Sequence, residues 1–180
     1  MIDEVAEASE AGLRREPPEI GALGDLAGSI AARLVARGET VAVSESSAGG
    51  LISAALLAMP GASAYFVGGV VVYTATARQA FLGIDQASMA NVRSATEPYA
   101  GMLARAVRSR LGADWAVAET GAAGPAGNRY GDAAGYVCLA IAGPSEKVLT
   151  LKTGMADRAG NMRAFASAAL SMLNDALEEA

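Results

Sequence analysis

Apolar and polar positions alternate along the chain with two different periods. Between residues 25 and 36, apolar side chains recur at the spacing of one helical face, and Gly38 follows as a helix stop. Residues 40–43 form a short apolar run that predicts a strand, and residues 65–73 form a longer run rich in β-branched side chains. We interpret 65–73 as an interior strand, because the run is too continuously apolar for a half-exposed edge.

The other segments continue this alternation of helices and strands. Thr96 is predicted to cap a helix that tolerates Pro98 in its first turn and stops at Gly112. The further predicted helices cover 48–59, 76–82 and 157–177, and the further strands cover 114–119, 135–141 and 147–152, the last two as a hairpin. Strands interleaved with helices and ending in a hairpin predict an α/β fold, namely a three-layer α/β/α sandwich with a mixed β-sheet.

Length and composition indicate one compact domain. The 180 residues suffice to bury a sizeable core, and 52% hydrophobic with 18% charged residues is typical of a soluble α/β protein rather than a disordered chain. Residues 1–22 carry several acidic side chains and a Pro-Pro break, so we expect an N-terminal tail that is flexible or weakly helical. Residues 23–180 are expected to form the domain.

The net charge and the counts of particular residues limit which kinds of partner and site the chain can have. The net charge of -5 argues against a nucleic-acid backbone as partner, and no apolar run reaches the roughly 20 residues needed to cross a membrane. The single Cys138 excludes an intrachain disulfide and is expected to be a buried apolar filler. Because the N-terminus also lacks a signal-peptide pattern, we expect a cytoplasmic protein. Without histidine or paired cysteines, we expect no metal.

Serines and a double glycine follow the strand 40–43. This order predicts a strand, a turn that carries hydroxyls, and a helix N-terminus whose free N–H groups point into the turn. Such a corner can hold an anion and can present a serine as nucleophile, although Ser46 and Ser47 could instead simply cap the helix. Two further turns, 73–78 and 120–127, also follow strands, and ligands of open α/β sheets bind where such turns meet.

Several well-known sequence motifs are absent. The chain has no phosphate-loop pattern ending in Gly-Lys-Ser/Thr and no G-x-G-x-x-G fingerprint, which argues against an ATPase and against a Rossmann dehydrogenase. It also lacks the G-x-S-x-G pattern of a nucleophile elbow. If a serine of the first turn is a nucleophile, it therefore lies in a different local motif from the G-x-S-x-G turn.

The chain resembles the C-terminal domain of the competence/damage-inducible CinA proteins. The runs 45–50, 60–66 and 68–73 carry the resemblance, and 96–98, 120–125 and 154–163 continue it in the same order, so that it covers residues 26–177. The family's characteristic activity is hydrolysis of the carboxamide of nicotinamide mononucleotide, which gives nicotinic acid mononucleotide and ammonia in pyridine-nucleotide salvage. The resemblance therefore implies an amidohydrolase with a small nucleotide substrate and no cofactor.

The resemblance also assigns catalytic positions. The family's nucleophile, the serine that follows glutamate in the first turn, falls on Ser46, and a tyrosine at the end of the next strand falls on Tyr73. The family's lysine, five residues further on, is Arg78 in this chain. The threonine before the double glycine is Ala48, and the asparagine after the tyrosine is Ala75. The chain thus departs from the family within the site itself.

Arg78 leaves two classes of function open. A neutral lysine can accept a proton, but a guanidinium stays protonated, and the chain's two lysines, Lys147 and Lys152, lie on the final hairpin. One possibility is a slow amidohydrolase in which Tyr73 is the base and Arg78 stabilises its phenolate. The other is a degenerate homologue that binds a nucleotide, or serves as a structural or regulatory subunit, without turnover.

Ligand binding is expected at the first and third turns and at two arginines near the start of the last helix. Glycines permit close backbone approach, and guanidiniums suit a phosphate, although arginines are most often surface charges. The predicted substrate-binding residues are Glu45, Ser47, Gly49, Gly50, Thr120, Gly121, Ala123, Gly124, Arg158 and Arg163. We also expect a homo-oligomer. Some family members are fused to an upstream domain, and the short tail predicts none here.

Overall fold

The computed structural model describes residues 22–180. The predicted tail therefore lies outside the described residues, except for residue 22. The predicted strands and helices of the domain are all present in this part of the chain.

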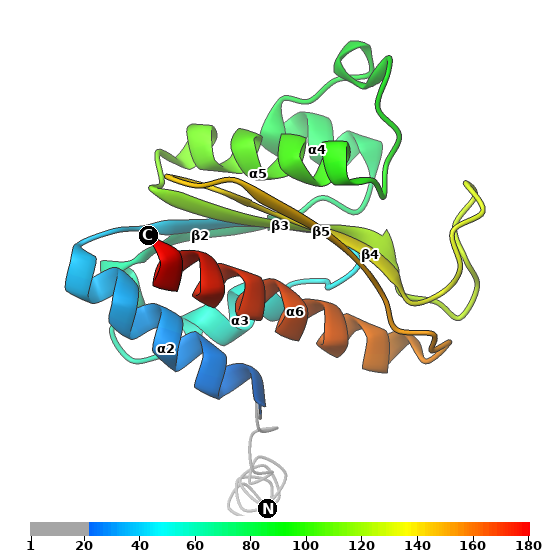
Figure 1. Cartoon of the computed structure of the whole chain (residues 1–180). Helices are drawn as coiled ribbons and strands as arrows, with labels where there is room; N and C mark the ends of the chain where they lie inside the picture. Colours follow the sequence, from blue (N-terminus) through cyan, green and yellow to red (C-terminus); the bar gives the residue numbers. More distant parts are fainter. Residues whose placement is uncertain (1–21) are drawn as a thin grey trace, which may run out of the picture.

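One mixed five-stranded sheet forms the middle layer of the fold (Figure 1). The strands are ordered β2-β1-β3-β4-β5, and β1 is parallel to both β2 and β3. β4 is antiparallel to β3, and β5 is antiparallel to β4. Their bounds are β1 (Val41–Glu45), β2 (Phe66–Val71), β3 (Trp115–Ala122), β4 (Tyr136–Ala142) and β5 (Lys147–Lys152). Because the carboxyl ends of the parallel strands β1, β2 and β3 lie at one edge, the loops that leave them are brought together there.

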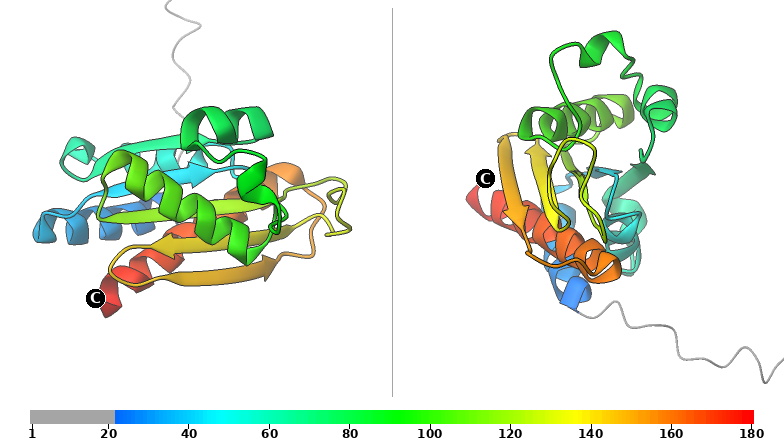
Figure 2. Two further views of the ribbon diagram at one scale, coloured as in Figure 1. Left: turned by 90° about the horizontal axis from the view of Figure 1, so that it is seen from above. Right: turned by 90° about the vertical axis from the view of Figure 1, so that its right-hand side faces the viewer.

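Helices cover both faces of the sheet (Figures 1 and 2), which confirms the predicted three-layer α/β/α sandwich. One face carries α2 (Ala22–Arg37), α3 (Leu51–Leu57) and α6 (Arg158–Glu179), and the other carries α4 (Ala75–Leu82) and α5 (Glu97–Leu111). Two short 3₁₀ turns lie at Ala62–Ala64 and Ala87–Met89. The core on the α6 side is packed around Trp115 and Phe165, and the smaller core on the α5 side is packed around Leu103.

Local signals in the sequence set several helix ends as predicted. The Thr96 hydroxyl accepts a hydrogen bond from the Tyr99 N–H and caps α5, which ends at Gly112 in the left-handed conformation. Asp157 caps α6 in the same way through the Gly160 N–H. Gly83 ends α4, also with a positive φ.

The prediction that residues 65–73 form an interior strand is wrong. β2 is an edge strand, and Val67 and Val71 are 43% and 41% exposed. Its register against β1 shifts between Val41 and Ala42, so one extra residue interrupts the alternation of inward and outward side chains. The alternate positions Val67, Gly69 and Val71 are exposed, so the continuous apolar run does not mark a strand that is buried on both faces.

Candidate functional site

The corner between β1 and α3 is built around the fully buried carboxylate of Glu45. This carboxylate accepts hydrogen bonds from the N–H groups of Gly50, Ile52 and Ser53 at 2.8, 3.1 and 2.9 Å, and from the Ser53 hydroxyl at 2.7 Å. A carboxylate from the strand thus caps the helix, which begins at Leu51, three residues later than predicted. The alternative that Ser46 or Ser47 caps this helix is wrong.

A second buried carboxylate, Glu119 of β3, holds the turn that precedes α3. It accepts hydrogen bonds from the N–H groups of Ser46 and Ala48 at 3.0 and 2.7 Å and from the Ser47 hydroxyl. Burial raises the pKa of Glu119, while these hydrogen bonds act in the opposite direction. Sequence reasoning missed this residue, although a single acidic side chain at the end of an apolar strand was a usable signal.

These two carboxylates change the expected chemistry of the corner. The N–H groups of the turn and of the first helical turn were expected to be free for a ligand's anion. Those that bind Glu45 and Glu119 are instead occupied by the protein's own carboxylates. These N–H groups are therefore not available to a ligand's anion.

A cavity of about 500 Å³ lies beside this corner, at the carboxyl ends of β1, β2 and β3. Ser46, Tyr73 and Arg78 all line it, together with Thr120 and Gly121. The structure thus brings together the three turns that follow these strands, as predicted. The cavity volume falls within the range typical of small-molecule sites, about 300–1,000 Å³.

Arg78 is a buried charge rather than the surface charge that arginine commonly is. Its side chain is 6% exposed, and its Nε donates a hydrogen bond to the Ile84 carbonyl at 3.1 Å. Within residues 22–180, no carboxylate lies within ion-pair distance of this guanidinium. Tyr73 lies at the mouth of the cavity and is 63% exposed.

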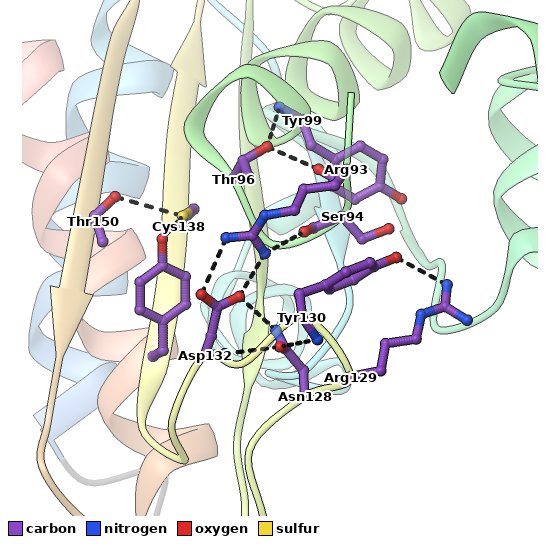
Figure 3. A network of polar contacts seen from close by, with 11 residues as sticks. Arg93, Ser94, Thr96, Tyr99, Asn128, Arg129, Tyr130, Asp132, Cys138 and Thr150 are labelled. Atoms are coloured by element: carbon purple, nitrogen blue, oxygen red, sulfur yellow. Dashed lines mark hydrogen bonds and ion pairs between the residues drawn. The ribbon is translucent and has the colours of Figure 1, made fainter. Parts of the chain in front are cut away.

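A polar network forms the outer wall of the cavity (Figure 3). The Arg93 guanidinium contacts Asp132 through two pairs of atoms, Nη1–Oδ2 at 2.6 Å and Nη2–Oδ1 at 3.1 Å. Both Arg93 and Arg129 lie over the Tyr130 ring, with 5.2 and 5.0 Å from Cζ to the ring centroid. Arg129 also donates to the Tyr130 hydroxyl at 2.9 Å, which lowers the pKa of Tyr130. Sequence reasoning missed this wall, because its partners come from separate connections.

Ala95 closes the same wall with an unusual backbone conformation. Its φ of 56° lies in the left-handed region, and the residue is buried beside the cavity. A non-glycine residue held in this region carries local strain, which proteins tend to keep at ligand sites.

The remaining predicted binding residues divide into two groups. Ser47, Ala123, Gly124 and Arg158 line a smaller neighbouring cavity of about 170 Å³, where Arg158 donates to the Gly124 carbonyl at 2.7 Å. Glu45, Gly49, Gly50 and Arg163 line neither cavity. The two glycines instead provide the positive φ angles, 68° and 101°, that the turn needs.

Two kinds of feature are absent from residues 22–180. These residues contain no group of three or more histidine, cysteine, aspartate or glutamate side chains placed to hold a metal ion. None of the helices described is both long and apolar enough to span a bilayer.

The chain is similar to known proteins in both sequence and structure. A family model described as the CinA C-terminal domain matches residues 24–177. A CinA-like protein of Gloeobacter violaceus is 44% identical over 121 residues, and one of Anaeromyxobacter sp. (strain K) is 41% identical over 148 residues. These matches cover 67% and 82% of this chain but only 28% and 36% of the relatives, so the chain spans about a third of their length or less.

Solved structures agree with the sequence matches. A CinA superfamily protein from Klebsiella pneumoniae superposes with a TM-score of 0.82 at 26% identity, covering 88% of this chain and 99% of that one. The competence/damage-inducible protein from Agrobacterium tumefaciens superposes with a TM-score of 0.78 at 31% identity, covering 91% and 99%.

Proposed function

Because the chain belongs to the family of CinA C-terminal domains, we propose that it is an amidohydrolase that releases ammonia from nicotinamide mononucleotide or a closely related carboxamide. Ser46 is the proposed nucleophile. The observation that carries the proposal is the shared cavity, since Ser46 from the turn after β1 and Tyr73 and Arg78 from the connection after β2 line the same 500 Å³ space.

The proposed reaction proceeds through an acyl-enzyme. The Ser46 Oγ attacks the carboxamide carbon and gives up its proton to a base, for which the Tyr73 phenolate is the candidate at the cavity mouth. The Arg78 guanidinium stabilises the phenolate, and it also stabilises the negative charge that develops on the carboxamide oxygen. The C–N bond then breaks, the nitrogen takes a proton and leaves as ammonia, and water hydrolyses the ester to the acid and regenerates Ser46.

One observation favours a second candidate, a protein that binds a nucleotide without turning it over. Arg78 occupies the position where the family has a lysine, and a guanidinium cannot serve as a base. No lysine lines the cavity among the residues described. If Tyr73 does not act as the base, the same cavity would bind its ligand and release no product.

Ammonia release from nicotinamide mononucleotide distinguishes the two candidates. An amidase releases ammonia as wild type, loses at least about 10²-fold in rate as Ser46→Ala, and keeps its rate as Ser109→Ala, a matched change on the exposed face of α5. If Ser46→Ala keeps the wild-type rate, the proposed nucleophile is wrong. If the wild type is silent and Arg78→Lys gains activity, the chain is a decayed amidase. A silent protein whose melting temperature still rises with the nucleotide is a binder.

A further inference from the structure

We infer that the cavity binds the acid form of a mononucleotide more tightly than its amide, with Arg78 as the receptor for the carboxylate and Arg129 as the receptor for the phosphate. The choice of a pyridine mononucleotide as ligand rests on the proposed function. The preference for the acid goes beyond it, because it assigns two arginines to two anionic ends of one ligand.

The burial of Arg78 and its unused hydrogen-bond donors support its assignment to the ligand's carboxylate. A buried guanidinium without a charge partner is costly, and a ligand's anion would offset that cost. The Arg78 Nε donates a hydrogen bond to the Ile84 carbonyl, while its two terminal nitrogens form no hydrogen bond within residues 22–180. Two neighbouring N–H donors of a guanidinium match the two oxygens of a carboxylate, whereas a carboxamide is neutral and offers only one oxygen acceptor.

The outer wall of the cavity supports the assignment of Arg129 to the ligand's phosphate. Arg129 is exposed and lines the same cavity, and its guanidinium contacts the hydroxyl and the ring of Tyr130. The wall that carries it is tied to the connection before α5 by the Arg93–Asp132 ion pair. An arginine that is ordered before the ligand arrives loses less side-chain entropy on binding. Its guanidinium at the rim suits a phosphate, which stays partly in water.

The charged side chains that line the cavity are consistent with a ligand that has two anionic groups. Arg78 and Arg129 line it, and no aspartate or glutamate of the described chain does so. Nicotinic acid mononucleotide carries a carboxylate and a phosphate, so it matches both guanidiniums, whereas nicotinamide mononucleotide matches only one. An amidase with this cavity would hold its own product, and a binder with this cavity would respond to the acid.

Binding measured in the Ser46→Ala protein tests the inference without turnover. Calorimetric titrations would use four probes, namely nicotinic acid mononucleotide, nicotinamide mononucleotide and the two corresponding ribosides, which lack the phosphate. We expect the acid mononucleotide to bind at least about tenfold more tightly than the amide. Adding Arg78→Gln should bring this ratio close to one. Adding Arg129→Gln should instead remove the advantage of the mononucleotides over the ribosides and leave the acid-to-amide ratio intact.

Two further variants serve as controls for the binding experiment. Arg110→Gln removes an exposed arginine of α5 that lines none of the cavities and should change neither ratio. If Arg78→Gln does not fold, Arg78→Lys keeps the charge but loses the paired donors and should reduce the ratio only in part. An amide that binds as tightly as the acid, a ratio that survives loss of Arg78, or no binding of any probe by a folded protein would overturn the inference.

This test and the test of the proposed function can fail separately. Ammonia release without a preference for the acid would overturn the inference alone. A preference for the acid without any ammonia release would overturn the amidohydrolase alone.

Discussion

Glu119 is an acidic residue whose protonation is coupled to the geometry of the turn that carries Ser46. Its carboxyl group binds two N–H groups and one hydroxyl of that turn and has no exposure to solvent. Because burial raises its pKa above that of the unfolded chain, the folded protein keeps a proton that the unfolded chain loses. The contribution of Glu119 to stability is then greatest below the unfolded pKa, about 4.3, and falls as the pH rises towards the folded value.

Replacing Glu119 by glutamine should flatten this pH dependence. The amide oxygen can accept the two N–H groups, and the amide nitrogen can donate to the Ser47 hydroxyl, so the geometry is kept without the ionisation. Urea unfolding at several pH values between 4.5 and 7 would compare the slopes, which differ by up to about 1.4 kcal/mol per pH unit for one proton. Glu146→Gln, on the exposed surface, should retain the wild-type slope. Parallel curves for wild type and Glu119→Gln would contradict the prediction.

Tyr73 offers a second test at the level of one residue. If its phenolate is the base for Ser46, Tyr73→Phe should lower the rate of ammonia release by about 10²–10⁴-fold, the usual contribution of a general base. Tyr136→Phe makes the same change on β4, away from the 500 Å³ cavity, and should leave the rate near wild type. Full activity in Tyr73→Phe would show that the base is a different group.

At the level of elements, the sheet depends on close approach at Gly121. A Cβ at this position would meet the Tyr136 carbonyl oxygen and lie 2.9 Å from the Val137 Cα, and both are backbone atoms of the paired strand β4. No side-chain movement can relieve these contacts. Because Gly121 also lines the cavity, the same close approach shapes the site.

We therefore expect Gly121→Ala to destabilise the fold by about 1–3 kcal/mol or more, since β4 would have to move away from β3. Gly28→Ala is the matched control. Its nearest atom outside the helix, Met59 Sδ, is 3.7 Å from the added Cβ, and alanine in the interior of α2 should stabilise the protein by about 0.5–1 kcal/mol. Urea unfolding measures both variants. Equal effects of the two substitutions would show that the contact with β4 is not decisive.

The contrast between helix ends and buried contacts shows what the sequence can predict. Thr96 and Gly112 act on residues at most four positions away, so their role as helix ends follows from local sequence. Glu119 binds Ser46 across 73 positions, and this contact depends on β1 and β3 being neighbours. The edge position of β2 likewise depends on the order of strands, which the apolar pattern does not specify.

The candidate site follows the same division. Placing Ser46 and Tyr73 after parallel strands, with Arg78 in the helix that follows Tyr73, was possible because parallel strands bring such connections together. Neither the burial of Arg78 nor the absence of a carboxylate beside it in the described chain could be predicted, since both depend on how α4 packs. The family resemblance supplied positions, and the packing supplies their electrostatics.

At the level of the whole molecule, the cavity is closed by two connections that meet outside the sheet. The segment 83–96 precedes α5, the segment 123–135 joins β3 to β4, and the ion pair of Arg93 with Asp132 links them (Figure 3). Arg93 holds the pKa of Asp132 below its usual value, so the pair contributes above a pH of about 3.9 and is lost only as the pH falls through that lower pKa. Mild acid therefore leaves the wall closed, and a substitution is needed to open it.

Asp132→Asn should loosen the wall while the fold remains intact. Exposed ion pairs contribute only about 0.2–1 kcal/mol, so the melting temperature should change by a few degrees at most. Hydrogen exchange at residues 128–131 should become several-fold faster, because Asp132 also holds Arg93 and the Asn128 amide. Asp175→Asn, an exposed change on α6, should leave that exchange unchanged. If exchange in Asp132→Asn stays at the wild-type rate, the ion pair does not hold this segment, and the position of Arg129 then depends on other contacts such as those with Tyr130.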